Sequence, residues 1–315
     1  MKNWKRKIQN IALTSFKACF LFSLLSLSHV RAEKMNDVKY LFSFKTNKST
    51  CILRVNGFPA IENSKAESGT ISAGFNMTAF LENGDNDIEM LMGSLDYEDP
   101  DTLYSDSSCQ ITISKDTEES SVEMANFKLS VNDKGQITAG ESTNFETGPF
   151  NSKVLEGYTR NEKDYGLYKL RSSLVVKGLP GWSWVNATPV TDHDLPLIRK
   201  AYTDIWNMMR NRDIEGLKKF TQISTEEMAF AEGSTTGMMF ISTGFPQRVI
   251  DKKLSPIPLE WEKYELVRYR GGRLFRLATG YNQNSPLRFK DSSGKIVFAY
   301  NPYFSIIDGK VLLVR

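Results

Sequence analysis

Gly-Phe-Asn-Met-Thr-Ala-Phe-Leu-Glu-Asn-Gly-Asp-Asn-Asp-Ile-Glu-Met, residues 74–90, is the stretch that decides the fold of this chain. Gly84 favours a tight turn because glycine accepts left-handed backbone angles, and the side chain of Asn86 can bond the backbone of the loop beside it. Ile88 then returns the chain to the hydrophobic core. The stretch therefore predicts a loop that turns into a buried strand.

Short segments in which polar and apolar residues alternate lie on both sides of this stretch, and a period of two is typical of β-strands. Turn sequences such as Asn56-Gly57 and Asn132-Asp-Lys-Gly135 separate them. Many short strands with regular turns predict an all-β sandwich. The predicted strands are Leu41–Phe44, Cys51–Val55, Thr70–Ala73, Asp87–Met92, Gln110–Ile113, Val122–Val131 and Leu174–Val176.

The same region resembles the jelly-roll sandwich with a galactose-binding-like fold that is attached to many glycoside hydrolases. In that fold a strand ends in Val-Asn-Gly, as Val55-Asn56-Gly57 does here, and a later segment carries six characteristic residues at set spacing. The resemblance implies a jelly-roll-like fold and not sugar binding, because one fold hosts unrelated functions. The six matching positions are Phe75, Thr78, Leu81, Gly84, Asn86 and Ile88.

The charge of the chain changes sign near residue 190. Residues 33–190 contain 15 Lys and Arg against 23 Asp and Glu, whereas residues 191–315 contain 19 against 14. The sequence Asn-Ala-Thr-Pro-Val-Thr-Asp-His-Asp, residues 186–194, has the composition of a linker. We therefore expect two domains, a β-sandwich of residues 33–186 and an α+β domain of residues 197–315, joined by a linker of residues 187–196.

The second domain is predicted to begin with an amphipathic helix. Ile198, Tyr202, Ile205 and Met209 fall on one face at helical spacing, and Asp194 is the expected N-cap. Helices first and a curled antiparallel sheet after them make an α+β arrangement. The six strands predicted after the helices are Tyr264–Tyr269, Leu274–Tyr281, Leu287–Lys290, Ile296–Tyr300, Phe304–Ile307 and Val311–Val314.

Three features lie between the first helix and the strands. Asp213 is expected to cap a second helix, and Ser224 with Glu227 makes a capping box for a third. The glycine-containing stretch Gly233–Gly244 lacks the Lys-Ser/Thr ending of a phosphate-binding loop and is interpreted as a mobile loop.

Residues 201–217 resemble the first two helices of the cone-shaped fold of nuclear transport factor 2 and SnoaL-like (NTF2-like) proteins, in which an aromatic-rich helix runs into a second helix that begins at Asp. Enzymes of that fold do their chemistry in the mouth of the cone. The resemblance places Tyr202 and Trp206 at that mouth, with Asp204 as an acid or base. Core packing explains both aromatic residues without chemistry, and Asp204 falls on the polar face of the helix.

The first 32 residues are predicted to be a cleaved signal peptide. A basic start with Lys2, Lys5, Arg6 and Lys7 precedes an apolar run from Ala18 to Leu27, and Val30-Arg31-Ala32 has the small residues of a cleavage site. The apolar run is shorter than the roughly 20 residues of a membrane span. We therefore expect a periplasmic protein, cleaved near Ala32, without a stable membrane anchor.

Cysteine and histidine usage limits the chemistry that the exported part can perform. Cys51 and Cys109 are the cysteines that remain after cleavage, and in an oxidising compartment two cysteines most often pair. His193 is the remaining histidine, so a multi-histidine metal site is excluded. Residues 33–315 contain 34 basic and 37 acidic residues, and this balance does not favour nucleic acid as a partner. No cofactor or metal is expected.

Three groups of side chains are candidates for binding. The hairpin with Arg268, Arg270, Arg273 and Arg276 could hold a phosphate or a carboxylate with paired hydrogen bonds, although an ordinary solvated strand face explains it as well. Trp182 and Trp184 alternate like strand residues, and an exposed tryptophan would suggest a sugar platform or a partner anchor. The acidic run 82–123, with Glu98, Asp99 and Asp101, is interpreted as a solvated surface, with a docking face for a basic partner or a calcium site as alternatives.

These features favour a periplasmic binding or inhibitor protein. The whole chain resembles exported Gram-negative proteins, some of which are immunity partners of interbacterial toxins, and this resemblance implies a periplasmic toxin or enzyme as the protein partner. Two alternatives remain: an enzyme that uses the C-terminal cone with Asp204 or His193, and a carbohydrate-binding module that uses Trp182 or Trp184.

Overall fold

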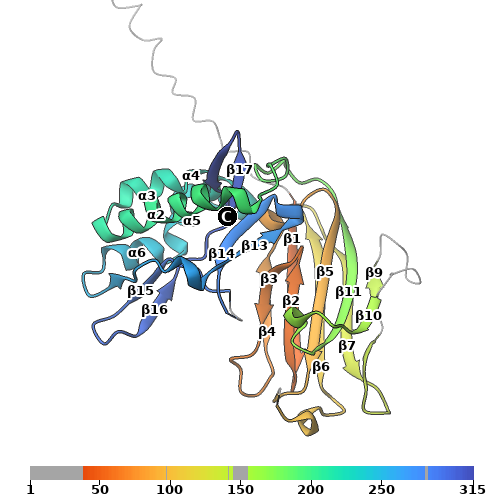
Figure 1. The fold of residues 1–315 in the computed structure, drawn as a ribbon. Coiled ribbons are helices and arrows are strands. Elements are labelled where there is room, and N and C mark those ends of the chain that lie inside the picture. Colours follow the sequence, from red (N-terminus) through yellow and green to blue (C-terminus); the bar gives the residue numbers. More distant parts are fainter. Residues whose placement is uncertain (1–37, 97, 141, 145–154, 281–282) are drawn as a thin grey trace, which may run out of the picture. The chain divides into compact units, whose positions relative to one another are not determined.

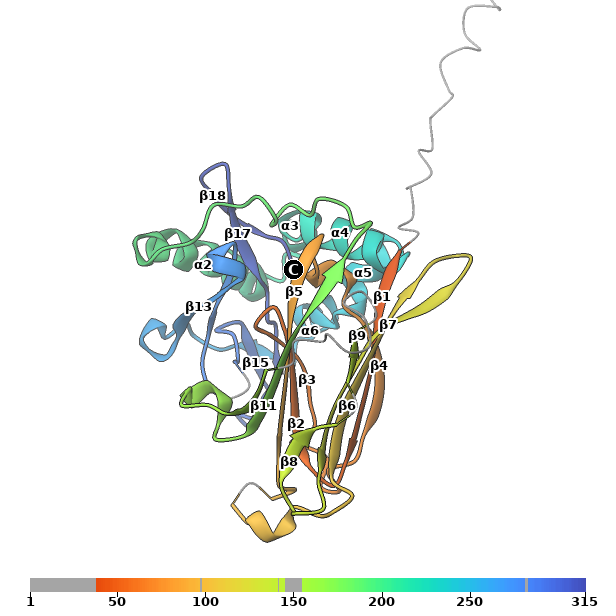
Figure 2. The ribbon, with the colours of Figure 1, turned by 90° about the vertical axis from the view of Figure 1, so that its right-hand side faces the viewer.

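Two antiparallel sheets pack face to face in the first half of the chain (Figures 1 and 2). One sheet has the strand order β4-β1-β6-β7-β8, with β9 beside β7, and the other has the order β10-β11-β5-β2-β3. The strands are β1 (Lys39–Asn47), β2 (Thr50–Val55), β3 (Phe58–Glu62), β4 (Ser72–Asn76), β5 (Gly84–Gly93), β6 (Ser108–Asp116), β7 (Ser121–Val131), β8 (Ile137–Ala139), β9 (Thr143–Asn144), β10 (Leu155–Tyr158) and β11 (Tyr168–Val176).

The structure is a computed structural model that describes residues 38–315 except 97, 141, 145–154 and 281–282. The predicted signal peptide, residues 1–32, lies outside the described residues. Within the described part, no helix has both the length and the apolar character needed to cross a membrane.

The sandwich core follows from the period-two alternation of its strands. In β1 the rings of Tyr40, Phe42 and Phe44 point inward and are buried, while the residues between them are more exposed. The facing sheet contributes the same pattern from β5 and β11, for example Ile88 and Leu174. The predicted all-β sandwich is therefore confirmed.

The stretch 74–90 folds as its residues predict. Gly84 has φ +97°, a conformation that favours glycine, and begins β5. The Asn86 side chain is fully buried, donates to the carbonyls of Glu82 (2.7 Å) and Gly84 (3.0 Å), and accepts from the amide of Glu82 (3.1 Å). Asn56, from the Val-Asn-Gly segment, donates to Asn86 Oδ1 at 2.9 Å. These two asparagines hold the loop that contains Glu82 against the end of the sandwich.

The second half of the chain is a cluster of helices followed by two antiparallel sheets, which confirms the predicted α+β arrangement (Figure 1). The helices are α2 (Leu195–Asn211), α3 (Ile214–Phe220), α4 (Gln222–Glu232), α5 (Thr236–Ser242) and α6 (Phe245–Ile250). The sheets are β12-β15-β16 and β13-β14-β17-β18, built from β12 (Ser255–Pro256), β13 (Glu265–Tyr269), β14 (Leu274–Ala278), β15 (Arg288–Lys290), β16 (Ile296–Ala299), β17 (Phe304–Ile307) and β18 (Lys310–Leu313).

The apolar face of α2 packs on the four-stranded sheet. Ile198, Tyr202, Ile205 and Met209 are all buried, as the helical spacing predicts. The Tyr202 hydroxyl accepts from the amide of Leu277 at 2.9 Å, so the helix is bonded to the backbone of β14.

β14 is buried on both faces, so both sides of this strand are covered by other parts of the protein. Phe275 and Leu277 belong to the core beneath α2, whereas Leu274 belongs to a different cluster that includes Phe58 and Ala79 of the sandwich. Alternation places Arg276 on the face with Leu274. The second face of this sheet therefore packs against the sandwich.

Several local predictions need correction. Asp194 stands at the N-cap position of α2 as predicted, but its side chain bonds no amide of that helix and instead accepts from the Thr191 amide at 2.8 Å. Ser224 lies inside α4 and makes no capping box with Glu227. The stretch Gly233–Gly244, expected to be a mobile loop, contains α5, which Thr235 caps. By contrast, Asp213 caps α3 as predicted, accepting from the Gly216 amide at 2.8 Å.

The expected linker, residues 187–196, is bonded to the C-terminal sheet. The Thr188 amide donates to Ile306 and the Val190 amide donates to Gly272, both at 2.9 Å. The side chains of Ala187 and Val190 are buried. The described residues of both halves form one compact unit.

The predicted Cys51–Cys109 disulfide is present and joins β2 of one sheet to β6 of the other. Both residues are fully buried, and their Cα atoms are 6.1 Å apart. The bridge closes a loop of 58 residues.

We expect reduction of this disulfide to lower the free energy of unfolding by about 4 kcal/mol, because a loop of this length loses that much chain entropy when it is closed. Urea unfolding with and without a thiol reductant measures the effect. The Cys51→Ala/Cys109→Ala variant is the control, since the reductant should leave its midpoint unchanged. A wild-type midpoint that does not respond to reductant would contradict the prediction.

Candidate binding site

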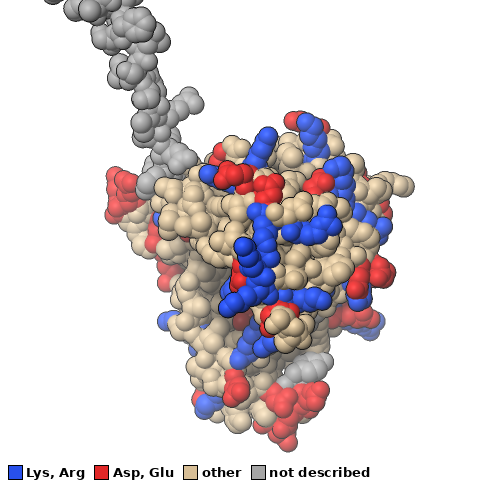
Figure 3. Space-filling view, turned by 90° about the vertical axis from the view of Figure 1, so that its left-hand side faces the viewer, with Lys and Arg blue, Asp and Glu red and all other residues tan. Residues whose placement is uncertain are grey.

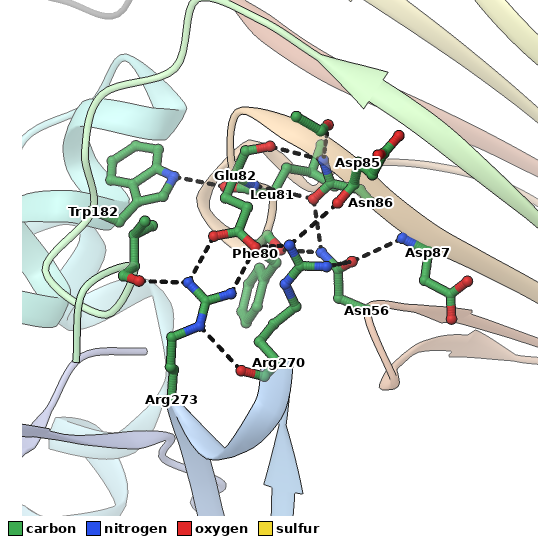
Figure 4. Close-up of polar contacts among 12 residues, drawn as sticks. Asn56, Phe80, Leu81, Glu82, Asp85, Asn86, Asp87, Trp182, Arg270 and Arg273 are labelled. Carbon is green, nitrogen blue, oxygen red and sulfur yellow. Dashed lines mark hydrogen bonds and ion pairs between the residues drawn. The ribbon is translucent and has the colours of Figure 1, made fainter. Parts of the chain in front are cut away.

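Glu82 joins the two halves of the molecule (Figure 4). Its carboxylate accepts two hydrogen bonds from Arg273, at 2.7 and 2.8 Å, and also forms an ion pair with Arg270. Arg270 donates further to Asn56 Oδ1 at 2.8 Å. Glu82 and both guanidinium groups are largely buried, and burial lowers the pKa of Arg270 and Arg273, with the neighbouring Arg273 charge adding to the effect on Arg270. Glu82 offsets this penalty by pairing with both.

Arg315 makes a second set of contacts between the two halves of the chain. Its side chain is fully buried, pairs with Glu227 of α4 at 2.5 Å and donates from Nε to the carbonyl of Ala79 at 2.8 Å. The guanidinium also lies over the ring of Trp182, 5.1 Å from its centre. Because Ala79 belongs to the sandwich and Glu227 to the helices, this contact fixes both to one side chain.

Aromatic rings fill the seam, which we define as the contact between β3 and the loop before β5 on one side and β13–β14 on the other. Phe58 stacks on Tyr269, with ring centres 4.6 Å apart, and meets Tyr303 edge-on at 5.2 Å. The Trp182 indole donates to the carbonyl of Leu81 at 2.9 Å. These contacts and the two arginine ion-pair sites make the seam a continuation of the core.

The structure places several of the candidate binding residues close together, but in the interior of the protein rather than on its surface. Arg270 and Arg273 bind Glu82, and Trp182 and Trp184 are buried, so neither tryptophan presents a surface platform for a sugar. Arg268 is partly exposed and pairs with Asp192 at 2.5 Å. A partner-binding role for Arg270, Arg273 and the two tryptophans has no support from their contacts, whereas such a role for Arg268 remains a prediction.

Glu98, Asp99 and Asp101 lie apart from the seam, in an exposed loop around the short 3-10 helix η2 (Pro100–Thr102). The Asp99 carboxylate accepts from the Asp101 amide at 3.0 Å, so it caps its own loop. Binding of a basic partner by this loop remains a prediction. Within the described residues, no group of three or more potential metal ligands is arranged to hold an ion.

Surface charge follows the division seen in the sequence. Figure 3 shows Lys and Arg in a band over the C-terminal part, with some Asp and Glu among them; further acidic groups lie at the upper left edge and at the lower end, where the η2 loop lies in Figure 1. The exposed basic residues of α3, α6 and the turn that follows include Lys218, Lys219, Arg248, Lys252 and Lys253.

A cleft opens along the seam. It consists of two hollows of 410 and 390 Å³ that share Arg54, Tyr165 and Gln283 in their walls. The sandwich contributes β3 and the segment around Tyr165, and the C-terminal part contributes β13, β14 and the residues after them. We call these two hollows the seam cleft. Its size is in the range of small-ligand sites.

Four charged side chains at the sandwich wall of the cleft balance one another. Arg54 pairs with Asp164 (2.7 Å) and Glu89 (3.7 Å), and Lys169 pairs with the same two carboxylates at 3.3 and 2.7 Å. Thr159 also donates to Asp164, at 2.5 Å. Burial, the largest single effect, favours the neutral acid, but the bonds from Thr159, Arg54 and Lys169 together outweigh it and hold the pKa of Asp164 below its usual value.

Arg276 lies in the opposite wall and is 3 % exposed. Its Nη2 donates to Gln283 Oε1 at 2.8 Å, and its guanidinium lies over the ring of Tyr303, 4.8 Å from the centre. Its Nε is buried and has no hydrogen-bond partner in the described part of the chain. Burial raises the pKa of Tyr303 and Tyr269, so both hydroxyl groups stay neutral at pH 7 and act as donors rather than bases.

The groups proposed for an enzyme lie elsewhere. Asp204 is on the solvent side of α2 and pairs with Lys200 at 2.6 Å, and His193 is exposed at the start of that helix. Tyr202 is fully buried in the helix–sheet core, and Trp206 packs against that core and donates to the carbonyl of Ile257 at 2.7 Å. None of these four residues lines either hollow of the seam cleft.

No protein-family model matches this chain, and comparisons with curated proteins and with solved structures found no match either. The resemblances to the jelly-roll sandwich, to the cone-shaped fold and to immunity proteins therefore remain predictions from the sequence.

We expect Glu82→Gln to lower the free energy of unfolding by about 3 kcal/mol, because it leaves two largely buried guanidinium groups without their carboxylate. Urea unfolding at pH 7 measures the change. Asp101→Asn removes one exposed carboxylate and should change stability by about 0.5 kcal/mol or less. Equal stabilities of the two variants would show that Glu82 does not hold the seam together.

Asp164→Asn should destabilise the wall of the cleft by about 2 kcal/mol at pH 7, since it weakens charge-assisted hydrogen bonds. A carboxylate with a lowered folded pKa contributes its stability above the unfolded value of about 3.9 and loses it as the pH falls through the folded value. The difference between variant and wild type should therefore shrink between pH 5 and about pH 3. Urea unfolding across this range tests it, with the exposed Glu162→Gln as control. A difference that stays constant on acidification would contradict the assignment.

Proposed function

We propose that this chain is an exported binding protein of the inhibitor type, and that its partner occupies the seam cleft. The observation that carries this proposal is the cleft itself: two walls from different halves of the chain, held by ion pairs, with a buried arginine that is not fully bonded. Binding sites are characteristically concave and contain a small number of placed polar groups. The basic and apolar start of the sequence supports export to the periplasm.

The chemical nature of the cleft favours binding over turnover. The polar groups that face the 410 Å³ hollow are guanidinium groups, two amides and tyrosine hydroxyls, which hold anions and hydrogen-bond acceptors, together with the carboxylate of Glu62. A nucleophile and a base at hydrogen-bonding distance are the usual signature of covalent catalysis, and the cleft residues named above do not supply that pair. The resemblance to immunity partners of interbacterial toxins makes a periplasmic toxin the partner that we propose.

The rigidity of the seam suits an inhibitor. A protein that binds without rearranging loses less conformational entropy on association, and more of its contact energy appears as affinity. The bidentate Arg273–Glu82 pair and the Arg315 contacts hold both walls before any partner arrives. Such a site would release its partner slowly.

A substitution that fills the cleft tests this function. Pro59 is exposed in β3 and lines the 410 Å³ hollow, so Pro59→Trp places a large ring in the space without removing an ion pair. We expect this variant to bind the partner at least tenfold more weakly, because the occupied volume is lost. The partner is captured from the periplasmic fraction with wild-type protein, and its affinity for each variant is then measured by calorimetry.

Val122→Trp is the matched control. Val122 is 53 % exposed in β7 and lines neither hollow, so it adds the same ring to a surface away from the cleft. This variant should bind like wild type. Equal binding by Pro59→Trp and Val122→Trp would mean that the partner uses another surface, and the η2 loop would be the next candidate.

A further inference from the structure

Arg276 differs from the other buried arginines of the seam. Arg54, Arg270, Arg273 and Arg315 each have a carboxylate within ion-pair distance. Arg276 has none among the described residues, and its one hydrogen bond there goes to the neutral amide of Gln283. A positive charge at 3 % exposure is therefore left with the ring of Tyr303 and an amide oxygen as its compensation.

This arrangement is unfavourable on its own. An unpaired charge buried away from water carries a large desolvation penalty, and an unbonded N–H adds to it. The aromatic ring recovers part of that penalty through cation–π attraction. The guanidinium lines the 410 Å³ hollow, so a ligand that enters the hollow can supply the missing negative charge.

We propose that the seam cleft binds a carboxylate group, with Arg276 as its anchor. This inference rests on the proposed binding function and names the chemistry of the occupant. A carboxylate in the hollow would pair with the guanidinium of Arg276, which lines the hollow and whose Nε lacks a partner among the described residues. Guanidinium–carboxylate pairs are the charge-assisted bonds that arginine geometry suits best. Gln283, Asn301 and Tyr303 in the same wall offer amide and hydroxyl groups to the rest of the ligand.

The surrounding charges select a single carboxylate over a phosphate. Arg54 is already balanced by Asp164 and Glu89, so it adds no free charge to the hollow. Glu62 also lines the 410 Å³ hollow, whereas the adjoining hollow carries Lys163, Lys263 and Arg268 besides Glu262 and Glu265. In the 410 Å³ hollow, one guanidinium without an ion-pair partner among the described residues matches one negative charge. The second charge of a phosphate dianion would lie near Glu62, with no further unpaired cation among the described residues that line this hollow.

Two sources can supply this group: a free organic acid, or a carboxylate carried by a protein partner. Both would place the same two oxygens against Arg276. The two sources differ in what surrounds the carboxylate. A partner's carboxylate would bring a peptide chain into the part of the cleft that both hollows share, beside Arg54, Tyr165 and Gln283. The probes below separate these sources.

The experiment measures thermal unfolding in sodium propionate against sodium chloride at equal ionic strength. With a dissociation constant of about 1 mM, about 100 mM propionate should raise the Tm of the wild-type protein by roughly 3 to 5 °C. Inorganic phosphate at the same ionic strength should raise it by less than half as much. The Arg276 Nε–H signal in a proton–nitrogen spectrum should shift in a saturable manner over the same propionate range.

Arg276→Gln should abolish the propionate-specific rise. Arg288→Gln is the matched control, because Arg288 also has a buried Nε without a partner and lies over a tyrosine ring, yet it lines neither hollow. It should keep the full rise. If Arg276→Gln does not fold, the shift of the Arg276 signal in wild-type protein decides the question by itself. A propionate effect that is absent, or that is unchanged in Arg276→Gln, overturns the proposal.

A short peptide with a free C-terminal carboxylate, compared with its amidated form, identifies the source. Tighter binding of the free peptide than of propionate, by tenfold or more, supports a carboxylate carried by a protein. Equal affinities support a free acid. If Pro59→Trp loses the captured partner while Arg276→Gln keeps full affinity for it, the carboxylate inference fails and the proposed function stands.

Discussion

The carboxylate of Glu82 is the interaction on which the rest of the structure depends. Two largely buried guanidinium groups converge on it, and either one without it would be an uncompensated charge in the interior. Its position is set by the buried Asn86 and Asn56 side chains, which hold the loop before β5. The β13–β14 hairpin is thereby fixed against the sandwich. The seam cleft and the placement of Arg276 in its wall both follow from that contact.

Local sequence patterns predicted the elements well because their cause is local. Alternation in β1 and β5 and the spacing of Ile198, Tyr202 and Ile205 in α2 report directly which face is buried. The two cysteines paired as expected, since the strands that carry them face each other across the core. β3 and α5 were missed, because Phe58–Glu62 lacks a clean alternation and Thr235 caps a helix of only seven residues.

The site could not be predicted in the same way. The arginine hairpin was recognised as unusual, but alternation does not say whether a strand face meets water or another sheet. Arg270 and Arg273 pair with the carboxylate of Glu82, which lies 191 positions before Arg273 in the chain. No sequence pattern near the two arginines indicates that partner. Trp182 and Trp184 were ambiguous for the same reason. Arg276 stands out in the structure because it is the charged residue of β14, a strand whose five residues are all buried. The sequence alone does not show that both faces of this strand are covered.

That long separation between Glu82 and Arg273 imposes an order on biosynthesis. At about 5 to 20 residues per second, a ribosome needs roughly 10 to 40 s to add the 191 positions between Glu82 and Arg273, and roughly 5 to 20 s of that time follows the last sandwich strand, β11. The nascent sandwich must keep Glu82 hydrated during that interval, with the rings of Phe58 and Phe80 uncovered beside it. The newborn chain thus passes through a stage in which apolar rings are exposed at one end of the sandwich, and such surfaces make partly folded chains prone to aggregation.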